Sequence, residues 1–217
     1  MNMRITRYFF CILMSAQLLF ALKDDRAIVE KIDKNRYRIE QLILDAEQQL
    51  IEIPAKINMS KGLIEVLLCT PKGKVHESLL VTPVRPLVLQ TALMTMGYIP
   101  LNNPGGQKVT PASFSIEIEL DGKRFGAGKL LWNQQLDQPV SDIPWTFVGS
   151  PIYPTGELAA EFEQTLIATY NLSCILANGL ETRHDDTVYR VNETTVPPKG
   201  TTARIFIQPI NEEKQPP

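Results

Sequence analysis

A regular alternation of apolar and polar residues between positions 114 and 120 limits the folds open to this chain. The segment reads Phe-Ser-Ile-Glu-Ile-Glu-Leu, without a break in the alternation. Successive side chains of a β-strand point to opposite faces, so this pattern predicts a strand with one buried and one solvated face. Asp121 and Gly122 follow directly and are typical of a tight turn. The chain must therefore build a sheet with a covered face.

Other segments indicate that strands dominate the fold. Strand patterns occur at residues 37–44, 50–57, 62–69, 74–81, 145–148, 165–169, 187–191 and 204–207. The Thr-Pro-Lys-Gly sequence at residues 70–73 has the signature of a type I turn, which predicts that residues 62–69 and 74–81 form a hairpin. The chain has 16 prolines, mostly between the expected strands, as suits a loop-rich β fold.

One helix is expected, at residues 86–96. Pro86 suits the first turn of a helix, apolar residues follow it, and Gly97 is placed as a C-terminal stop. A short helical turn is expected at residues 130–132. The predicted fold class is therefore α+β, a single domain with a predominantly antiparallel β-sheet and one main helix.

The N-terminus has the pattern of an export signal. Arg4 and Arg7 precede an almost wholly apolar stretch at residues 8–22, and a charged cluster begins at Lys23. A short basic region followed by an apolar stretch is typical of a secretory signal peptide. A membrane anchor is the alternative, although about 20 apolar residues are needed to span a bilayer. The positions before Ala21 lack the small residues of a good cleavage site, so both interpretations stay open.

The rest of the chain is expected to comprise a linker at residues 23–36, one globular domain at residues 37–210 and a disordered tail at residues 211–217. Among the 22 basic residues, only Arg4 and Arg7 fall within residues 1–22, so the remainder has 20 basic against 24 acidic residues. This balance excludes the strongly basic surface of a nucleic-acid-binding protein. No polybasic run is available to hold the domain on an anionic membrane, so membrane contact is expected only through a retained N-terminal segment.

Two cysteines lie outside the export segment, Cys69 and Cys174. An oxidising compartment permits a disulfide between them. Both lie in apolar segments, however, and free cysteines are often small buried residues, which is the interpretation that we favour. Two cysteines are too few for a zinc or iron–sulfur site.

Several motifs together suggest a family. They are Gly-Leu-Ile-Glu at residues 62–65, Gly-Lys-Val-His-Glu-Ser-Leu-Leu at 73–80, the end of the helix at 92–97, Trp-Thr-Phe-Val-Gly-Ser at 145–150, and Pro-Pro-Lys-Gly-Thr at 197–201. In this order and spacing the chain resembles the YdjY-like family of exported bacterial proteins. The resemblance covers residues 36–209, and the Gly-Lys-x-His-Glu-Ser block is its most distinctive part.

The resemblance implies a periplasmic or envelope protein of uncharacterised activity. Some family members are associated with iron–sulfur chemistry through added cysteines. This chain lacks that cysteine cluster, so the association does not carry over, and we expect no bound cofactor.

The clustered reactive residues are Glu65, His76, Glu77 and Ser78. If only two residues form the turn of the expected hairpin, Glu65 shares a face with His76 and Ser78. A turn longer by one residue places Glu65 beside Glu77 instead. The first arrangement suggests a nucleophile or a partial metal site, with His76 and Glu65 as ligands. The interpretation that we favour is structural: Glu65 and His76 pair with each other, or with backbone groups, at the edge of an apolar core. His184, Asp185 and Asp186, the other group considered as ligands, are expected to form a solvated loop.

We therefore expect an exported envelope or periplasmic protein with a non-catalytic binding or accessory function. Its expected partner is an envelope protein or a small ligand. The alternative is a metal-dependent or hydrolytic enzyme centred on Glu65, His76 and Glu77. Four large aromatic residues could line a ligand groove, but we expect them to belong to the core: Trp132, Trp145, Phe147 and Tyr153. Trp145 and Phe147 alternate as inward-facing residues do.

Overall fold

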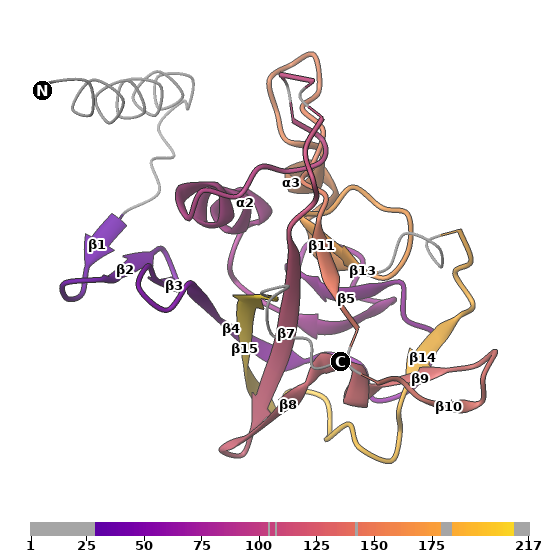
Figure 1. Ribbon diagram of the computed structural model, residues 1–217. Coiled ribbons are helices and arrows are strands. Elements are labelled where there is room, and N and C mark those ends of the chain that lie inside the picture. The colour runs from indigo at the N-terminus through magenta and orange to yellow at the C-terminus, as the bar shows by residue number, and fades with distance from the viewer. Residues whose placement is uncertain (1–28, 104, 107, 142, 179–183, 211–217) are drawn as a thin grey trace, which may run out of the picture.

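The computed structural model describes residues 29–103, 105–106, 108–141, 143–178 and 184–210. Strands dominate this part of the chain and helices are few, as the sequence patterns predicted (Figure 1). The expected signal or anchor segment and the expected C-terminal tail lie outside the described residues. In the described ranges, none of the helices has the length and apolar character needed to cross a membrane.

Three long strands form the centre of the sheet. They are β4 (Leu50–Ile57), β7 (Ser113–Leu120) and β15 (Thr202–Pro209). β15 lies between the other two and pairs antiparallel with both. Ile205 of β15 stands opposite Ile53 and Ile118, and all three side chains are fully buried. The alternation that predicted β7 therefore places its apolar side chains in a continuous row across three strands.

The sheet closes into an eight-stranded barrel instead of staying open. The remaining barrel strands are β5 (Val66–Cys69), β6 (Ser78–Val81), β11 (Trp145–Phe147), β12 (Thr165–Ala168) and β13 (Leu176–Asn178). Their order around the barrel is β4-β15-β7-β11-β13-β12-β5-β6, and pairing of β6 with β4 completes the ring. Closure removes the exposed sheet edges and encloses an apolar core. The prediction of a β-rich fold is confirmed, but the sequence patterns did not predict that the sheet closes into a barrel.

The predicted hairpin of residues 62–69 with 74–81 is wrong. β5 and β6 are neighbours but run parallel, with Val66 beside Ser78 and Leu68 beside Leu80. Residues 70–77 return the chain along the barrel before β6 begins. Parallel neighbours usually need a connection of a dozen or more residues. The short turn motif at residues 70–73 therefore predicted an antiparallel hairpin, which is the commoner arrangement for so short a connection. A second parallel pair joins β12 and β13.

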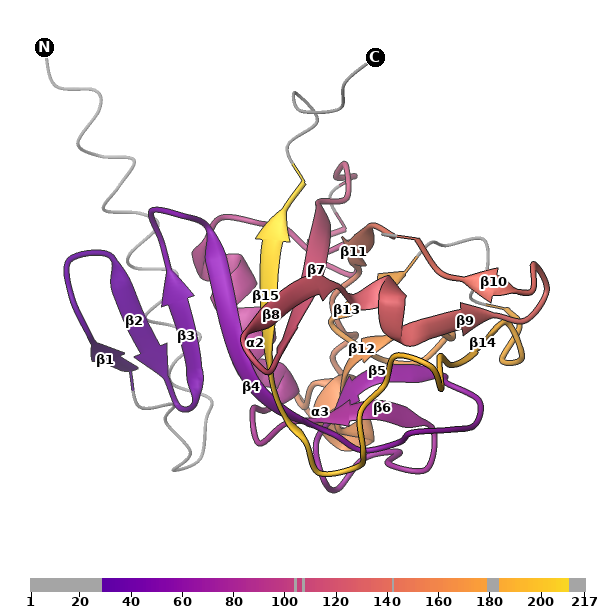
Figure 2. The ribbon, with the colours of Figure 1, turned by 90° about the horizontal axis from the view of Figure 1, so that it is seen from below.

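A three-stranded extension projects from β4 outside the barrel. It consists of β1 (Val29–Lys31), β2 (Arg36–Ile39) and β3 (Leu42–Asp45), joined by antiparallel pairs (Figure 2). The expected linker at residues 23–36 thus contains β1 and the start of β2. The single strand expected at residues 37–44 is divided by a turn in which Glu40 has a φ of 55°. Another strand, β8 (Lys123–Gly126), pairs with β7 after the predicted turn.

Two helices lie at the end of the barrel where β11 stops and β12 starts. Helix α2 (Pro86–Thr95) confirms the main predicted helix, and Gly97 follows it with a φ of 94°, which suits a glycine stop. The short helix α3 (Ala159–Glu163) was not predicted and leads directly into β12. The carboxylate of Glu161 accepts a hydrogen bond from the backbone N–H of Leu87, which joins the two helices.

A small second sheet lies at the opposite end of the barrel. It contains β9 (Leu131–Asn133), β10 (Gln138–Pro139) and β14 (Tyr189–Val191), preceded by the 3-10 helix η2 (Ala127–Leu130). The helical turn expected at residues 130–132 is therefore one turn earlier, and most of that segment is strand. Ile64, just before β5, donates its N–H to the carbonyl of Tyr189. Figure 1 shows this sheet and the two helices on different sides of the barrel.

Both cysteines of the described region are free and buried, as the sequence interpretation favoured. Burial also raises the pKa of the Cys69 thiol, which keeps that group in its neutral form. Trp145 and Phe147 are buried in the main core, as predicted. The same prediction is wrong for Tyr153, which is exposed, and Trp132 is only half-buried.

Replacement of Ile205 with alanine tests the barrel core. The variant leaves a cavity in the row formed with Ile53 and Ile118, and we expect it to lower the free energy of unfolding by about 2–5 kcal/mol. Urea denaturation followed by circular dichroism measures the loss. The matched control is Thr202→Ala on the same strand, which is exposed and should change stability by less than about 0.5 kcal/mol. Equal losses in the two variants would contradict the described core.

Candidate functional site

Two of the predicted site residues, Glu65 and Glu77, are brought together by the parallel pairing of β5 and β6. Each lies one residue before its strand, and Val66 stands beside Ser78. The backbone N–H groups of Glu65 and Val66 both approach the carbonyl oxygen of Glu77 at 3.1–3.2 Å. The two carboxyl side chains therefore start from adjacent positions at one end of the barrel.

Lys74 compensates the charge of these carboxylates. Its Nζ lies 4.0 Å from Glu65 Oε2 and 3.7 Å from Glu77 Oε2. His76 Nε2 lies 3.2 Å from Glu77 Oε1, but the His76 side chain is 73% exposed. The two carboxylates are more enclosed, with side chains 15% and 26% exposed. The cluster is thus an acidic pair with one ammonium group beside it and an imidazole at the solvent edge.

The pKa of Glu65 is raised above its usual value. Burial of the carboxyl group is the largest cause, and the negative charge of Glu77 is the next. The charge of Lys74 opposes the shift, while hydrogen bonding to Glu77 and the charge of Asp186 support it. Two carboxyl groups at close range favour a protonated form of one of them.

Ser78 lies away from this cluster, in the interior of the protein. Its side chain is fully buried and its hydroxyl donates a hydrogen bond to the carbonyl oxygen of Leu80. The buried amide of Asn58 donates to the carbonyl oxygens of Val75 and Ser78 and so fixes the start of β6. The arrangement of Glu65, His76 and Ser78 on one face is therefore wrong, because it relied on a hairpin that does not form.

The structure contains the other arrangement considered, in which Glu65 lies beside Glu77. The parallel pairing of β5 with β6 produces it, and not a longer hairpin turn. As potential metal ligands, His76 and Glu65 both lie near Glu77. Within the described ranges, no group of three or more His, Cys, Asp or Glu side chains is placed to hold a metal ion. His184 and Asp186 are exposed, and Asp185 accepts hydrogen bonds from Thr187, as in the predicted solvated loop.

Asn178, which the sequence analysis missed, is a buried amide at the same end of the barrel. It ends β13 and stands opposite Trp145 of β11. Its side chain is 1% exposed. Neither its Nδ2 nor its Oδ1 atom has a hydrogen-bond partner. No sequence signal marks this residue, because an asparagine at a strand end is usually part of a turn.

One strand, β12, separates the carboxyl pair from Asn178. Thr169, just after β12, donates its N–H to the carbonyl of Glu65. On the other side of β12, Ala168 pairs with Ala177, the residue before Asn178. The order β6-β5-β12-β13 therefore carries Glu77, Glu65 and Asn178 around one part of the barrel end. We call these three residues the polar rim.

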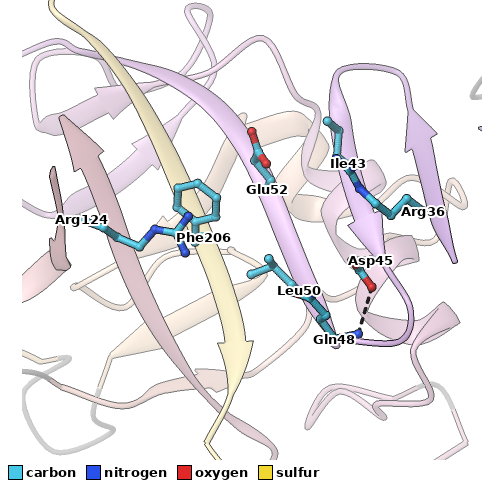
Figure 3. Close-up of a pocket in the computed structure, with 8 residues that line it drawn as sticks. All are labelled: Arg36, Ile43, Asp45, Gln48, Leu50, Glu52, Arg124 and Phe206. Atoms are coloured by element: carbon cyan, nitrogen blue, oxygen red, sulfur yellow. Dashed lines mark hydrogen bonds between the residues drawn. The ribbon is translucent and has the colours of Figure 1, made fainter. Parts of the chain in front are cut away.

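A shallow hollow of about 240 Å³ lies elsewhere, on the outer surface between the β2–β3 ribbon and the barrel (Figure 3). The guanidinium carbon of Arg124 lies 3.4 Å from the centre of the Phe206 ring, and that ring is 3% exposed. This stacking explains how an outward-facing aromatic side chain becomes buried. The hollow is lined by Arg36, Ile43, Asp45, Gln48, Leu50, Glu52, Arg124 and Phe206. Its charges are mixed, and its acidic residues already bind neighbouring groups.

Comparisons with protein-family models, curated proteins and solved structures found no match. The polar rim must therefore be interpreted from its own chemistry.

Replacement of Glu65 with glutamine tests the environment of the carboxyl pair. Because the folded-state pKa of Glu65 is raised, its favourable contribution to stability is present below its usual pKa and is lost as the pH rises through the folded-state pKa. Glutamine stays neutral at every pH. We therefore expect the stability of Glu65→Gln, relative to wild type, to increase between about pH 4 and pH 8.

Chemical denaturation at several pH values measures this difference. Glu193→Gln is the matched control, because Glu193 is exposed and is not part of the rim. A relative stability of Glu65→Gln that falls with increasing pH would show that the carboxylate is stabilised in the folded protein, contrary to the described environment.

Proposed function

We propose that this chain is an exported, YdjY-like domain of the bacterial envelope that binds a ligand or partner without catalysing a reaction. The proposal of export rests on the basic and apolar pattern of residues 1–22, and the family on the motifs at residues 62–80, 145–150 and 197–201. The single α+β domain of the proposal has its main helix at residues 86–95.

The observation that carries the non-catalytic proposal is the burial of Ser78 away from the cluster of Glu65, His76 and Glu77. Catalysis by Ser78 would require its hydroxyl to reach both a base and a substrate, whereas that hydroxyl is buried and bonded to the backbone. His76 contacts Glu77 from the solvent edge. A cation beside the carboxylates is already supplied by Lys74. These contacts support a binding or structural role for the cluster.

Metal analysis of purified protein, beside a His76→Ala variant, tests this proposal. We expect both proteins to contain far less than one equivalent of metal and to unfold at similar temperatures, because the imidazole is mostly in solvent. His76→Gln serves as a control for loss of the ring with a polar group retained. Stoichiometric zinc or manganese in the wild type that disappears in His76→Ala would overturn the non-catalytic proposal.

The second candidate is a hydrolytic enzyme that uses the carboxyl pair. The observation in its favour is the raised pKa of Glu65, since a carboxyl group that keeps its proton can serve as a general acid in hydrolysis. A panel of ester, phosphate and glycoside substrates distinguishes it. Turnover that is lost in both Glu65→Gln and Glu77→Gln would favour the enzyme over the binding domain.

A further inference from the structure

We propose that the hollow between the β2–β3 ribbon and the barrel binds a small zwitterion, a free α-amino acid with an apolar side chain. The inference rests on the proposed binding function and names a site and a class of ligand for it. The site does not include the cluster of Glu65, His76 and Glu77.

The size and lining of the hollow limit the ligand. Its volume is about 240 Å³, whereas sites for drug-sized ligands occupy about 300–1,000 Å³, so it admits only a smaller molecule. Figure 3 shows Arg124 and Arg36 at its two sides, with Glu52 and Leu50 between them. The lining contains two arginines, two acidic residues and three apolar residues. Such a surface favours a ligand that carries charges of both signs and an apolar group.

The guanidinium group of Arg124 is held in place but keeps hydrogen-bond donors for a ligand. It stacks on Phe206, with its central carbon atom 3.4 Å from the ring centre. Its ion pairs with Glu117 Oε2 and Glu119 Oε2 are 3.9 and 3.7 Å long. Both distances are too long for a normal hydrogen bond. The ring thus orients a group that binds carboxylates through two parallel N–H groups.

Glu52 supplies an acceptor beside that guanidinium group. It stands opposite Phe206 on the neighbouring strand, next to the ring on which Arg124 stacks. Its Oε1 atom accepts a hydrogen bond from Arg204 Nη1 at 3.3 Å. A carboxylate can accept several hydrogen bonds, so its Oε2 atom is left for a donor of the ligand.

An α-amino acid matches this pair because its ammonium and carboxylate groups are attached to the same carbon atom. The carboxylate binds Arg124, and the ammonium group binds Glu52. Leu50 lies two residues before Glu52 on the same face of β4, and Ile43 stands opposite Glu52 on β3. The side chain of the ligand therefore meets an apolar surface.

Ligands with a single charge fit this site less well. A simple carboxylate binds Arg124 but gives Glu52 no donor and adds a like charge beside it. A simple amine binds Glu52 but places its charge beside the guanidinium group. Like charges at such short range are unfavourable, so the lining selects for a zwitterion.

Leucine and two derivatives that each lack one charge test the inference. Leucinamide has no carboxylate, and N-acetylleucine has no ammonium group. Titration of the purified protein, followed by nuclear magnetic resonance of the backbone amides, should show saturable shifts around the hollow with leucine, at a Kd of about 1 mM or below. We expect each derivative to bind at least about tenfold more weakly, because it loses one charge-assisted contact.

Two substitutions in the lining test the assigned contacts. Glu52→Gln and Arg124→Lys should each weaken leucine binding by about tenfold, the second because lysine keeps the charge but lacks the planar fork. Glu30→Gln and Arg38→Lys are the matched controls. These two residues form an exposed ion pair of 2.8 Å on the ribbon, outside the lining of the hollow, so both variants should keep the leucine affinity of the wild type.

Absence of saturable shifts with leucine, or equal affinity for leucine and leucinamide, would overturn the inference. Wild-type leucine affinity in both lining variants would overturn it as well. If circular dichroism shows that Arg124→Lys does not fold, the effect of Glu52→Gln decides the question alone. Failure here leaves the non-catalytic proposal intact, since that proposal fails only with His76-dependent metal or with turnover by the carboxyl pair.

Discussion

Pairing of β6 with β4 is the constraint on which the remaining structure depends. It joins Ile57 to Leu80 and closes the sheet into a barrel. Because β6 must lie antiparallel to β4 while also flanking β5, the chain returns through residues 70–77 and pairs β5 and β6 in parallel. That return brings Glu65 and Glu77 to the same end of the barrel. The acidic pair is therefore a consequence of barrel closure.

The two ends of the barrel differ in chemistry. The end covered by α2 and α3 is closed mostly by apolar side chains, and its polar groups are paired, as in the bonds from Leu87 to Glu161 and from Ser150 to Gln90. The end covered by the small sheet contains a raised-pKa carboxyl group, its partner Glu77 and the buried amide of Asn178. Proteins tolerate unmatched buried polar groups mainly where function needs them. The two ends therefore differ in how their buried polar groups are paired.

Local patterns predicted much of the fold but not its closure. The strand at 113–120 and the helix at 86–95 follow from alternation, from Pro86 and from Gly97, because those signals lie within a few residues. The parallel pairing of β5 and β6 depends on contacts with distant β4 and β12, and a local turn motif favoured the wrong hairpin. The sequence identified Glu65 and Glu77 as candidate reactive residues. Asn178 was recognised only in the structure, where its side-chain amide is buried without a hydrogen-bond partner.

The central claim is that closure of the barrel makes Glu65 and Glu77 a coupled pair. Carbon-13 nuclear magnetic resonance of the two side-chain carboxyl groups, followed through a pH titration, measures this coupling directly. The account predicts a pKa for Glu65 above its usual value, raised by burial and by the charge of Glu77. A Glu65 carboxyl group that titrates at its ordinary pKa would contradict the described environment of the pair.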